Sequence, residues 1–162
     1  MKRLHILGNR NHGKTTLVLE LVEELTKQGF VVGTIKHTSH IHDLDTPGKD
    51  SWRHRKAGAT PAAITTPELF GIFAPRPEGV DQYEWMAPLY AHCDLVLVEG
   101  DRDAEGMKIE VWREAKGNAP IASSREDILA IVSDEQPPWK GEVLPRSELQ
   151  ALLNKLIVLL EL

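Results

Sequence analysis

The sequence predicts an α/β fold in which helices cover both faces of a mostly parallel, mixed sheet. Short apolar runs rich in β-branched residues recur along the chain, as expected for buried strands. Segments with helical periodicity separate most of these runs, and such alternation is typical of parallel sheets. Two runs near the middle of the chain are closely spaced, and they favour a mixed sheet over a purely parallel one.

The first elements are a strand, a glycine loop, a helix and a second strand. Residues 3–7 form the first apolar run. Residues 14–28 carry apolar side chains on one helical face, and Gly29 stands where a glycine ends a helix. Residues 30–35 form a short β-branched run, which predicts a buried strand.

A polar stretch at residues 37–49 is predicted to be a loop, and the remaining elements follow it. They are a helix at 50–57, strands at 62–66 and 69–73, a helix at 80–92, strands at 95–98, 108–112 and 128–132, and a helix at 147–160. The strand at 95–98 is the most apolar in the chain. The strand at 108–112 alternates, so we expect one of its sides to face solvent.

Size, charge and cysteine content narrow the class of protein. The 162 residues are close to the usual size of one domain, so a single domain over residues 1–162 is expected. The net charge of −5 argues against broad binding to nucleic acid or to an anionic membrane. The single cysteine, Cys93, favours a reducing compartment, the cytoplasm. The longest apolar tract is far shorter than the ~20 residues that a membrane-spanning helix needs.

Residues 8–15 carry the phosphate-loop pattern G-x-x-x-x-G-K-T between the first strand and the first helix. Glycine lets backbone N–H groups turn toward phosphate oxygens, and the helix presents its positive end to them. Lys14 would bring positive charge to the β- and γ-phosphates, and Thr15 would place its hydroxyl on Mg²⁺. The sequence therefore predicts a nucleoside triphosphate site in a three-layer sandwich of the P-loop type.

An acidic residue at the end of a neighbouring buried strand usually completes the magnesium shell in such sites. Glu99 directly follows the most apolar strand, whereas Asp94 precedes that strand and belongs to its far end. Glu99 is therefore the predicted magnesium partner of Thr15. Lys14 and Glu99 are the predicted catalytic groups.

Further candidates lie outside the phosphate loop. Lys36 and His37 stand where the polar stretch begins, and in P-loop folds the loop after the neighbouring strand approaches the γ-phosphate. The residues expected to bind nucleotide are Gly8, Asn11, His12, Gly13, Lys14, Thr15, Thr16, Lys36, His37, Arg53 and Asp134.

Histidines and carboxylates crowd the polar stretch. They are His37, His40, His42, Asp43 and Asp45. Three interpretations stay open: a solvated loop, a loop that responds to nucleotide or substrate, and a transition-metal site. Lys49, Arg53 and Lys56 follow at helical spacing, and they fit either a solvated helix face or a site for a second, anionic ligand.

Three segments together resemble one known family. They are GNRNHGKTTL at residues 8–17, GTIKHTSHIHDLDTPGKDSWRHRKAGA at 33–59, and DLVLVEG at 94–100 followed by KIEVWR at 108–113. The chain is similar in these segments to the molybdopterin-guanine dinucleotide biosynthesis protein B family. The likeness covers about the first 135 residues, and the middle segment is its distinctive part.

The resemblance implies a GTP-binding protein with weak GTPase activity, usually dimeric, that assists the guanylyltransferase joining GMP to molybdopterin. It implies phosphate roles for Gly13, Lys14, Thr15 and Thr16, and the acidic strand-end role for Glu99. It also suggests that the segment from His37 through Arg53 faces nucleotide or the molybdopterin cofactor.

Guanine specificity rests on the resemblance alone, because the chain has no N-K-x-D signature: Asn154 and Lys155 continue into Leu156 and Ile157, inside a predicted helix. Asp134 follows the last predicted strand, at a place where it could pair with the guanine edge. No glutamine or arginine that would assist hydrolysis is recognisable, so we expect turnover at roughly 10⁻⁴ to 10⁻² per second.

Two other functions fit a phosphate loop. A small-molecule kinase would use Lys49, Arg53 and Arg55 to grip an anionic acceptor. A nickel or zinc chaperone GTPase would use the loop histidines.

Overall fold

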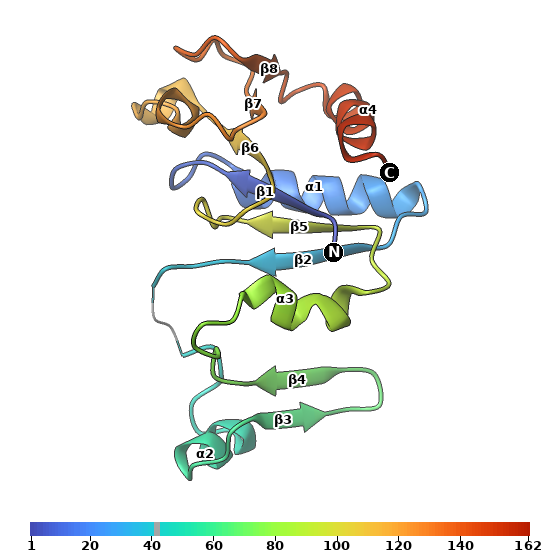
Figure 1. Cartoon of the computed structure of the whole chain (residues 1–162), viewed down its shortest axis with the longest axis vertical. Helices are drawn as coiled ribbons and strands as arrows, with labels where there is room; N and C mark the ends of the chain where they lie inside the picture. Colours follow the sequence, from blue (N-terminus) through green and yellow to red (C-terminus); the bar gives the residue numbers. More distant parts are fainter. Residues whose placement is uncertain (41–42) are drawn as a thin grey trace. The chain divides into compact units, whose positions relative to one another are not determined.

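The computed structural model describes residues 1–40 and 43–162. It divides into two compact units, one formed by residues 1–38 and 87–162 and the other by residues 39–86 (Figure 1). The single domain expected over residues 1–162 stays a prediction.

The first unit contains a six-stranded sheet whose order is β2-β5-β1-β6-β7-β8 (Figure 1). Its strands are β1 (Arg3–Leu7), β2 (Val32–Lys36), β5 (Leu95–Glu99), β6 (Met107–Val111), β7 (Ala130–Val132) and β8 (Glu142–Leu144). Every pairing in this sheet is parallel. All six strands therefore direct their carboxyl ends to one edge, where the loops that follow them gather.

The six-stranded sheet is parallel rather than mixed, because the antiparallel pairing expected in it forms in another sheet. β3 (Ala62–Thr65) and β4 (Phe70–Phe73) pair antiparallel in a separate two-stranded sheet of the second unit. The turn between them is too short for a crossover, which requires a dozen or more residues, so these strands form a hairpin. The sequence located both strands but not the sheet to which they belong.

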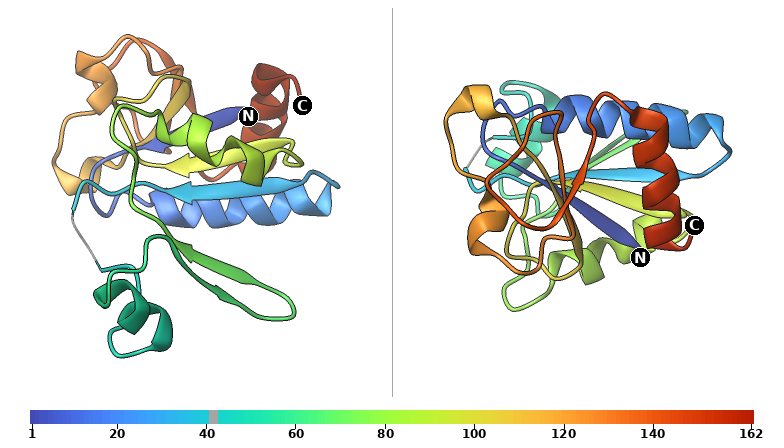
Figure 2. Two further views of the ribbon diagram at one scale, coloured as in Figure 1. Left: turned by 60° about the horizontal axis from the view of Figure 1, so that its bottom comes forward. Right: turned by 90° about the horizontal axis from the view of Figure 1, so that it is seen from above.

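Two apolar clusters cover opposite faces of the six-stranded sheet. α1 (Lys14–Lys27) and α4 (Leu149–Leu160) bury their leucines in one cluster, and the right view of Figure 2 draws the two helices next to each other. Leu7 and Ile131 belong to the other cluster, together with Trp112 and the segment that follows it. Successive residues of a strand point to opposite faces, and this explains why Ile6 and Leu7 belong to different clusters.

β6 differs from its prediction because no side of it faces solvent. Lys108 and Glu110 are buried. The Lys108 ammonium pairs with Asp127 at 2.7 Å, and the Glu110 carboxylate accepts hydrogen bonds from the main-chain N–H groups of Ile121 and Ala122, both at 2.9 Å. Burial raises the pKa of Glu110. The alternation of polar and apolar residues in β6 therefore reflects buried polar groups with hydrogen-bond partners rather than a solvent-exposed face.

The expected helix at 80–92 is also shorter than predicted. α3 (Gln82–Met86) ends the second unit, and a 3₁₀ turn (Ala87–Tyr90) begins the next part of the first unit. Pro88 lies in that turn, and a proline has no N–H to continue an α-helix. In the second unit, α2 (Asp50–Lys56) packs against β3.

Candidate functional site

The phosphate loop connects β1 to α1 and lies close against the end of β6. Gly8 has a φ of +140°, and a Cβ atom at this position would stand 2.4 Å from the carbonyl oxygen of Val111. Gly13 caps α1 with a φ of +98°. Only glycine adopts both geometries without strain, so the two glycines of the motif are required by the backbone itself.

The Lys14 side chain folds back over the loop. Its ammonium donates hydrogen bonds to the carbonyl oxygens of Gly8 and Asn9, both at 2.8 Å. Burial lowers the pKa of Lys14; the Glu99 carboxylate opposes that effect and the Lys36 ammonium adds to it. The positive charge is thus held over the loop that would receive phosphate.

Thr15 and Glu99 form the oxygen pair expected at a magnesium site. The Thr15 hydroxyl donates to both Glu99 carboxylate oxygens, at 2.9 and 3.0 Å. Glu99 is only 7% exposed, at the end of β5, and it also pairs with Lys36. Hydroxyl and carboxylate oxygens suit Mg²⁺, which takes few protein ligands besides phosphate and water. The residues present therefore fit the ion.

The register of the sheet explains why these side chains meet. Lys36 of β2 lies directly opposite Glu99 of β5, and Ile6 of β1 lies opposite Glu99 on the other side. β5 is thus between the phosphate-loop strand and the strand that carries Lys36. The sequence predicted Glu99 as the acidic partner of Thr15, and the parallel register of β2 and β5 brings Lys36 next to Glu99.

Arg113 is a site residue that sequence reasoning missed. It follows β6, the other neighbour of β1, and its Nη2 stands 2.9 Å from the position of a Cβ on Gly13. Among the described residues, no ion pair involves its guanidinium. A cation directly after a buried strand was the available signal, but it needed the knowledge that β6 pairs with β1.

His12 holds the main chain of Arg113 from within the loop. It is fully buried, and its Nδ1 accepts the N–H of Arg113 at 3.1 Å. Burial lowers the pKa of His12, and the Lys14, Lys116 and Arg113 charges lower it further. A neutral ring with its proton on Nε2 is the form that accepts this bond. His12 acts behind the loop rather than from the wall of the cavity.

These groups surround a cavity of about 450 Å³ at the carboxyl edge of the sheet. It is lined by Arg10, Asn11, Gly13, Lys14, Thr15, Thr16, Lys36, Glu99 and Arg113. Four of these side chains are cationic and one is acidic. The charge and position suit a polyanion with one divalent cation.

Three other predicted residues are not among those that line this cavity. His37 donates its main-chain N–H to the carbonyl oxygen of Glu99 at 3.0 Å. The Asp134 carboxylate accepts the N–H of Ser147 at 2.7 Å, which lowers the pKa of Asp134. Arg53 belongs to α2 of the second unit and pairs with Asp50 at 3.8 Å. Their nucleotide roles stay predictions.

The histidine segment shows no metal cluster among the residues that are described. No three histidine, cysteine or acidic side chains come together there or elsewhere in residues 1–40 and 43–162. Asp43 and Asp45 instead hold Arg55, at 3.2 and 3.4 Å. His42 falls outside the described residues.

Comparison with known proteins identifies relatives along most of the chain. The family model described as "Molybdopterin guanine dinucleotide synthesis protein B" matches residues 3–134. The chain is 35% identical to the molybdopterin-guanine dinucleotide biosynthesis adapter protein of Escherichia coli over 127 residues, covering 75% of this chain and 72% of that protein. The protein of the same name from Haemophilus influenzae is 33% identical over 133 residues, covering 81% and 74%.

Solved structures share the fold. A crystal structure of molybdopterin-guanine biosynthesis protein B is 26% identical, covers 99% of both chains and superposes with a TM-score of 0.73. The MobB protein homolog from Bacillus stearothermophilus is 24% identical, with the same coverage and a TM-score of 0.70. No helix in the described part of the chain is long and apolar enough to cross a membrane.

Proposed function

Because the chain belongs to the molybdopterin guanine dinucleotide synthesis protein B family, we propose that it is a GTP-binding adapter for the conversion of molybdopterin to its guanine dinucleotide. The observation that carries the proposal is the cavity in which Lys14, Thr15 and Glu99 converge. Its chemistry suits a magnesium nucleoside triphosphate. The choice of GTP comes from the family, since no guanine-binding signature is visible.

The residues of the cavity divide the binding of Mg·GTP among them. The loop N–H groups and the start of α1 would receive the β-phosphate, and Lys14 would exchange its two carbonyl partners for phosphate oxygens. Thr15 and Glu99 would hold the magnesium ion, which supplies charge neutralisation between the β- and γ-phosphates. Arg113 and Lys36 would add positive charge from the two flanking strands.

We propose that hydrolysis is slow and that the protein acts mainly through binding. None of the described side chains in the cavity is a glutamine or a carboxylate free of partners that would orient water. Arg113 would supply an arginine from the same chain, whereas the sequence pattern revealed no arginine that could assist hydrolysis. Turnover of roughly 10⁻² per second or below is expected, since a switch GTPase with its own arginine reaches about that rate.

The proposal includes the setting in which the adapter works. The partner is the molybdenum cofactor guanylyltransferase, the second ligand is the molybdopterin cofactor, and the protein acts as a cytoplasmic homodimer. The partner and the second ligand rest on the names of the relatives and on the family resemblance, the homodimer rests on the resemblance alone, and the cytoplasm rests on the single cysteine. The net charge of −5 supports partners other than nucleic acid.

The test measures nucleotide binding and stimulation of the guanylyltransferase separately. GTP and ATP are titrated in a calorimeter with Mg²⁺ present, and the guanylyltransferase is assayed on molybdopterin with and without the protein. We expect tighter binding of GTP than of ATP and faster guanylylation. Lys14→Ala should lose both effects, whereas Lys140→Ala, a lysine outside the cavity, should keep them. Phosphorylation of an added acceptor, or wild-type GTP affinity in Lys14→Ala, would contradict the proposal.

A further inference from the structure

The nucleoside of a bound GTP has to leave the phosphate-loop cavity on the side away from Glu99. Glu99 and Lys36 belong to β5 and β2, which lie on one side of β1 in the sheet. A magnesium ion on Thr15 and Glu99 would bridge the β- and γ-phosphates, so the terminal phosphate takes that side. The α-phosphate and the nucleoside then extend toward β6 and β7, on the other side of β1. A residue that binds the base is therefore expected in the loops that follow these two strands.

The loops after β6 and β7 are hydrogen-bonded to each other and to the phosphate loop. The Nδ1 atom of His12 accepts the main-chain N–H of Arg113 at 3.1 Å. The next residue, Glu114, donates its main-chain N–H to Oε2 of Glu135 at 3.3 Å. Burial lowers the pKa of His12, and the Glu135 carboxylate opposes that shift, so its charge lies within electrostatic reach of the phosphate loop. Glu135 thus brings an acidic group from the end of β7 to the side of the phosphate loop.

One oxygen of the Glu135 carboxylate is anchored and the other is open. Besides the Glu114 N–H, Oε2 accepts the Ser133 hydroxyl at 3.1 Å, and the Glu135 N–H donates to that same hydroxyl at 3.1 Å. Ser133 is only 3% exposed, which holds the anchor in place. Within residues 1–40 and 43–162, Oε1 accepts no hydrogen bond and Glu135 joins no ion pair. The half-buried carboxylate is therefore fixed in position with an oxygen available to a ligand.

The neighbouring carboxylate, Asp134, is engaged in a different contact. Its Oδ1 accepts the main-chain N–H of Ser147 at 2.7 Å, and this bond is the main cause of the lowered pKa of Asp134. Asp134 thus ties the end of β7 to the segment after β8, whereas Glu135 ties it to the segment after β6. The sequence pattern favoured Asp134 as the partner of the guanine edge, but these hydrogen bonds favour Glu135.

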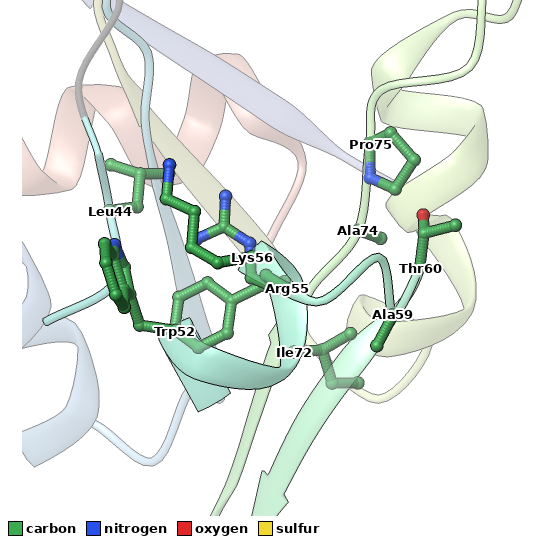
Figure 3. A pocket seen from close by; sticks show the side chains of 10 residues that line it. Leu44, Trp52, Arg55, Lys56, Ala59, Thr60, Ile72, Ala74 and Pro75 are labelled. Carbon is green, nitrogen blue, oxygen red and sulfur yellow. The ribbon is translucent and has the colours of Figure 1, made fainter. Parts of the chain in front are cut away.

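A carboxylate can distinguish guanine from adenine by the hydrogen-bonding pattern of the base edge. Guanine presents two donors side by side, the N1–H and the 2-amino group, and an ionised carboxylate only accepts hydrogen bonds. Adenine presents the lone pair of N1 at the corresponding position, so the same carboxylate disfavours it. The pocket of the unit formed by residues 39–86 offers no such acceptor, because no carboxylate is among the described residues that line it (Figure 3).

We propose that Glu135 selects guanine by receiving the N1–H and the 2-amino group of the base. Ser133 and the main chain of Glu114 act through Glu135, as positioning groups that fix its carboxylate. This role rests on the proposed function, since it requires GTP to occupy the phosphate-loop cavity. It adds to that function the residue that sets the choice of base.

The first test compares four magnesium nucleotides in a calorimeter with the wild-type protein. They are GTP; inosine triphosphate, which lacks the 2-amino group; xanthosine triphosphate, which carries an oxygen in its place; and ATP. We expect GTP to bind about tenfold more tightly than inosine triphosphate, because one charge-assisted hydrogen bond is missing, and the other two to bind more weakly still. Equal affinities for GTP and inosine triphosphate would overturn the proposal, and this measurement needs no variant.

The second test exchanges the carboxylate for an amide. Glu135→Gln should weaken GTP binding about 10- to 100-fold and leave ATP affinity unchanged. Xanthosine triphosphate should bind more tightly to this variant than to the wild type, because an amide N–H donates to the 2-oxygen that a carboxylate repels. A merely structural change would weaken all four nucleotides alike, and that result would refute the proposal. Loss of the preference for GTP in Asp134→Asn, with the preference kept in Glu135→Gln, would refute it too.

Glu126→Gln is the matched control. Glu126 is an exposed glutamate of the same unit that does not line the phosphate-loop cavity, so this variant should keep the wild-type preference. Far-ultraviolet circular dichroism checks that all the variants fold. The two proposals fail in different ways. Wild-type protein that prefers GTP, with the preference kept in Glu135→Gln, refutes only the role of Glu135, whereas wild-type protein that binds no nucleoside triphosphate refutes the proposed function as well.

Discussion

Gly8→Ala should destabilise the protein strongly, because the new methyl group meets backbone rather than a movable side chain. The Cβ would stand 2.4 Å from the carbonyl oxygen of Val111, well inside van der Waals contact. A φ of +140° also costs an alanine about 1–3 kcal/mol. Separating the phosphate loop from the end of β6 adds about 1–3 kcal/mol, as overpacking of a tight interior does.

Gly29→Ala is the matched control for that substitution. Gly29 has a φ of +93°, but a Cβ there would have no neighbour within 4 Å, so this variant bears the backbone cost alone. The free energy of unfolding from urea titration should therefore fall by about 2–6 kcal/mol in Gly8→Ala and by about 1–3 kcal/mol in Gly29→Ala. GTP affinity should fall only in Gly8→Ala, because Val111 is two residues before Arg113, which lines the cavity. Equal losses of stability in the two variants would refute the reasoning.

Three other substitutions test the same site. Arg113→Gln should weaken GTP binding about 10- to 100-fold through loss of a charged contact, while Arg102→Gln, a control outside the cavity, should not; equal calorimetric affinities would remove Arg113 from the site. Glu99→Gln should raise the magnesium concentration needed for half-maximal GTP binding at least tenfold, and an unchanged titration would exclude Glu99 from the magnesium shell. Because the pKa of His12 is lowered in the folded protein, the unfolded chain binds a proton on His12 at a higher pH than the folded protein does. The free energy of unfolding should therefore fall as the pH drops from 6.5 toward the pKa of His12 in the folded protein. Urea titrations of His12→Gln should show a weaker pH dependence than those of the wild type.

The local pattern was enough to predict the phosphate loop and its immediate partners. β1 has the bounds expected from its apolar run, and α1 begins at the expected lysine. Glu99 was predicted from the apolar strand before it, and the structure places its carboxylate on the Thr15 hydroxyl. These features depend on contiguous residues or on a rule about strand ends, and a single sequence carries both.

Features that depend on the order of the strands in the sheet could not be predicted from the sequence. Arg113 reaches the site only because β6 pairs with β1, and nothing in the residues around it states that order. The partners of Lys108 and Glu110 come from segments 11 to 19 residues away. The sequence pattern therefore predicted that these two side chains are exposed, although they are buried. β8 is a three-residue strand on the edge of the sheet, too short to give a periodic signal.

Glu99 also anchors the chain at the point where it leaves the first unit. Its carboxylate holds the Lys36 ammonium, and its carbonyl oxygen holds the N–H of His37, one residue before Thr38 ends that unit. If Thr15 and Glu99 held a magnesium ion, the Glu99 carboxylate would be shared between that ion and Lys36, whereas the bond from the His37 N–H to the Glu99 carbonyl oxygen would remain. Occupancy of the phosphate site would thus take away the side-chain partner of Lys36 while the main chain at the end of β2 stays fixed to β5.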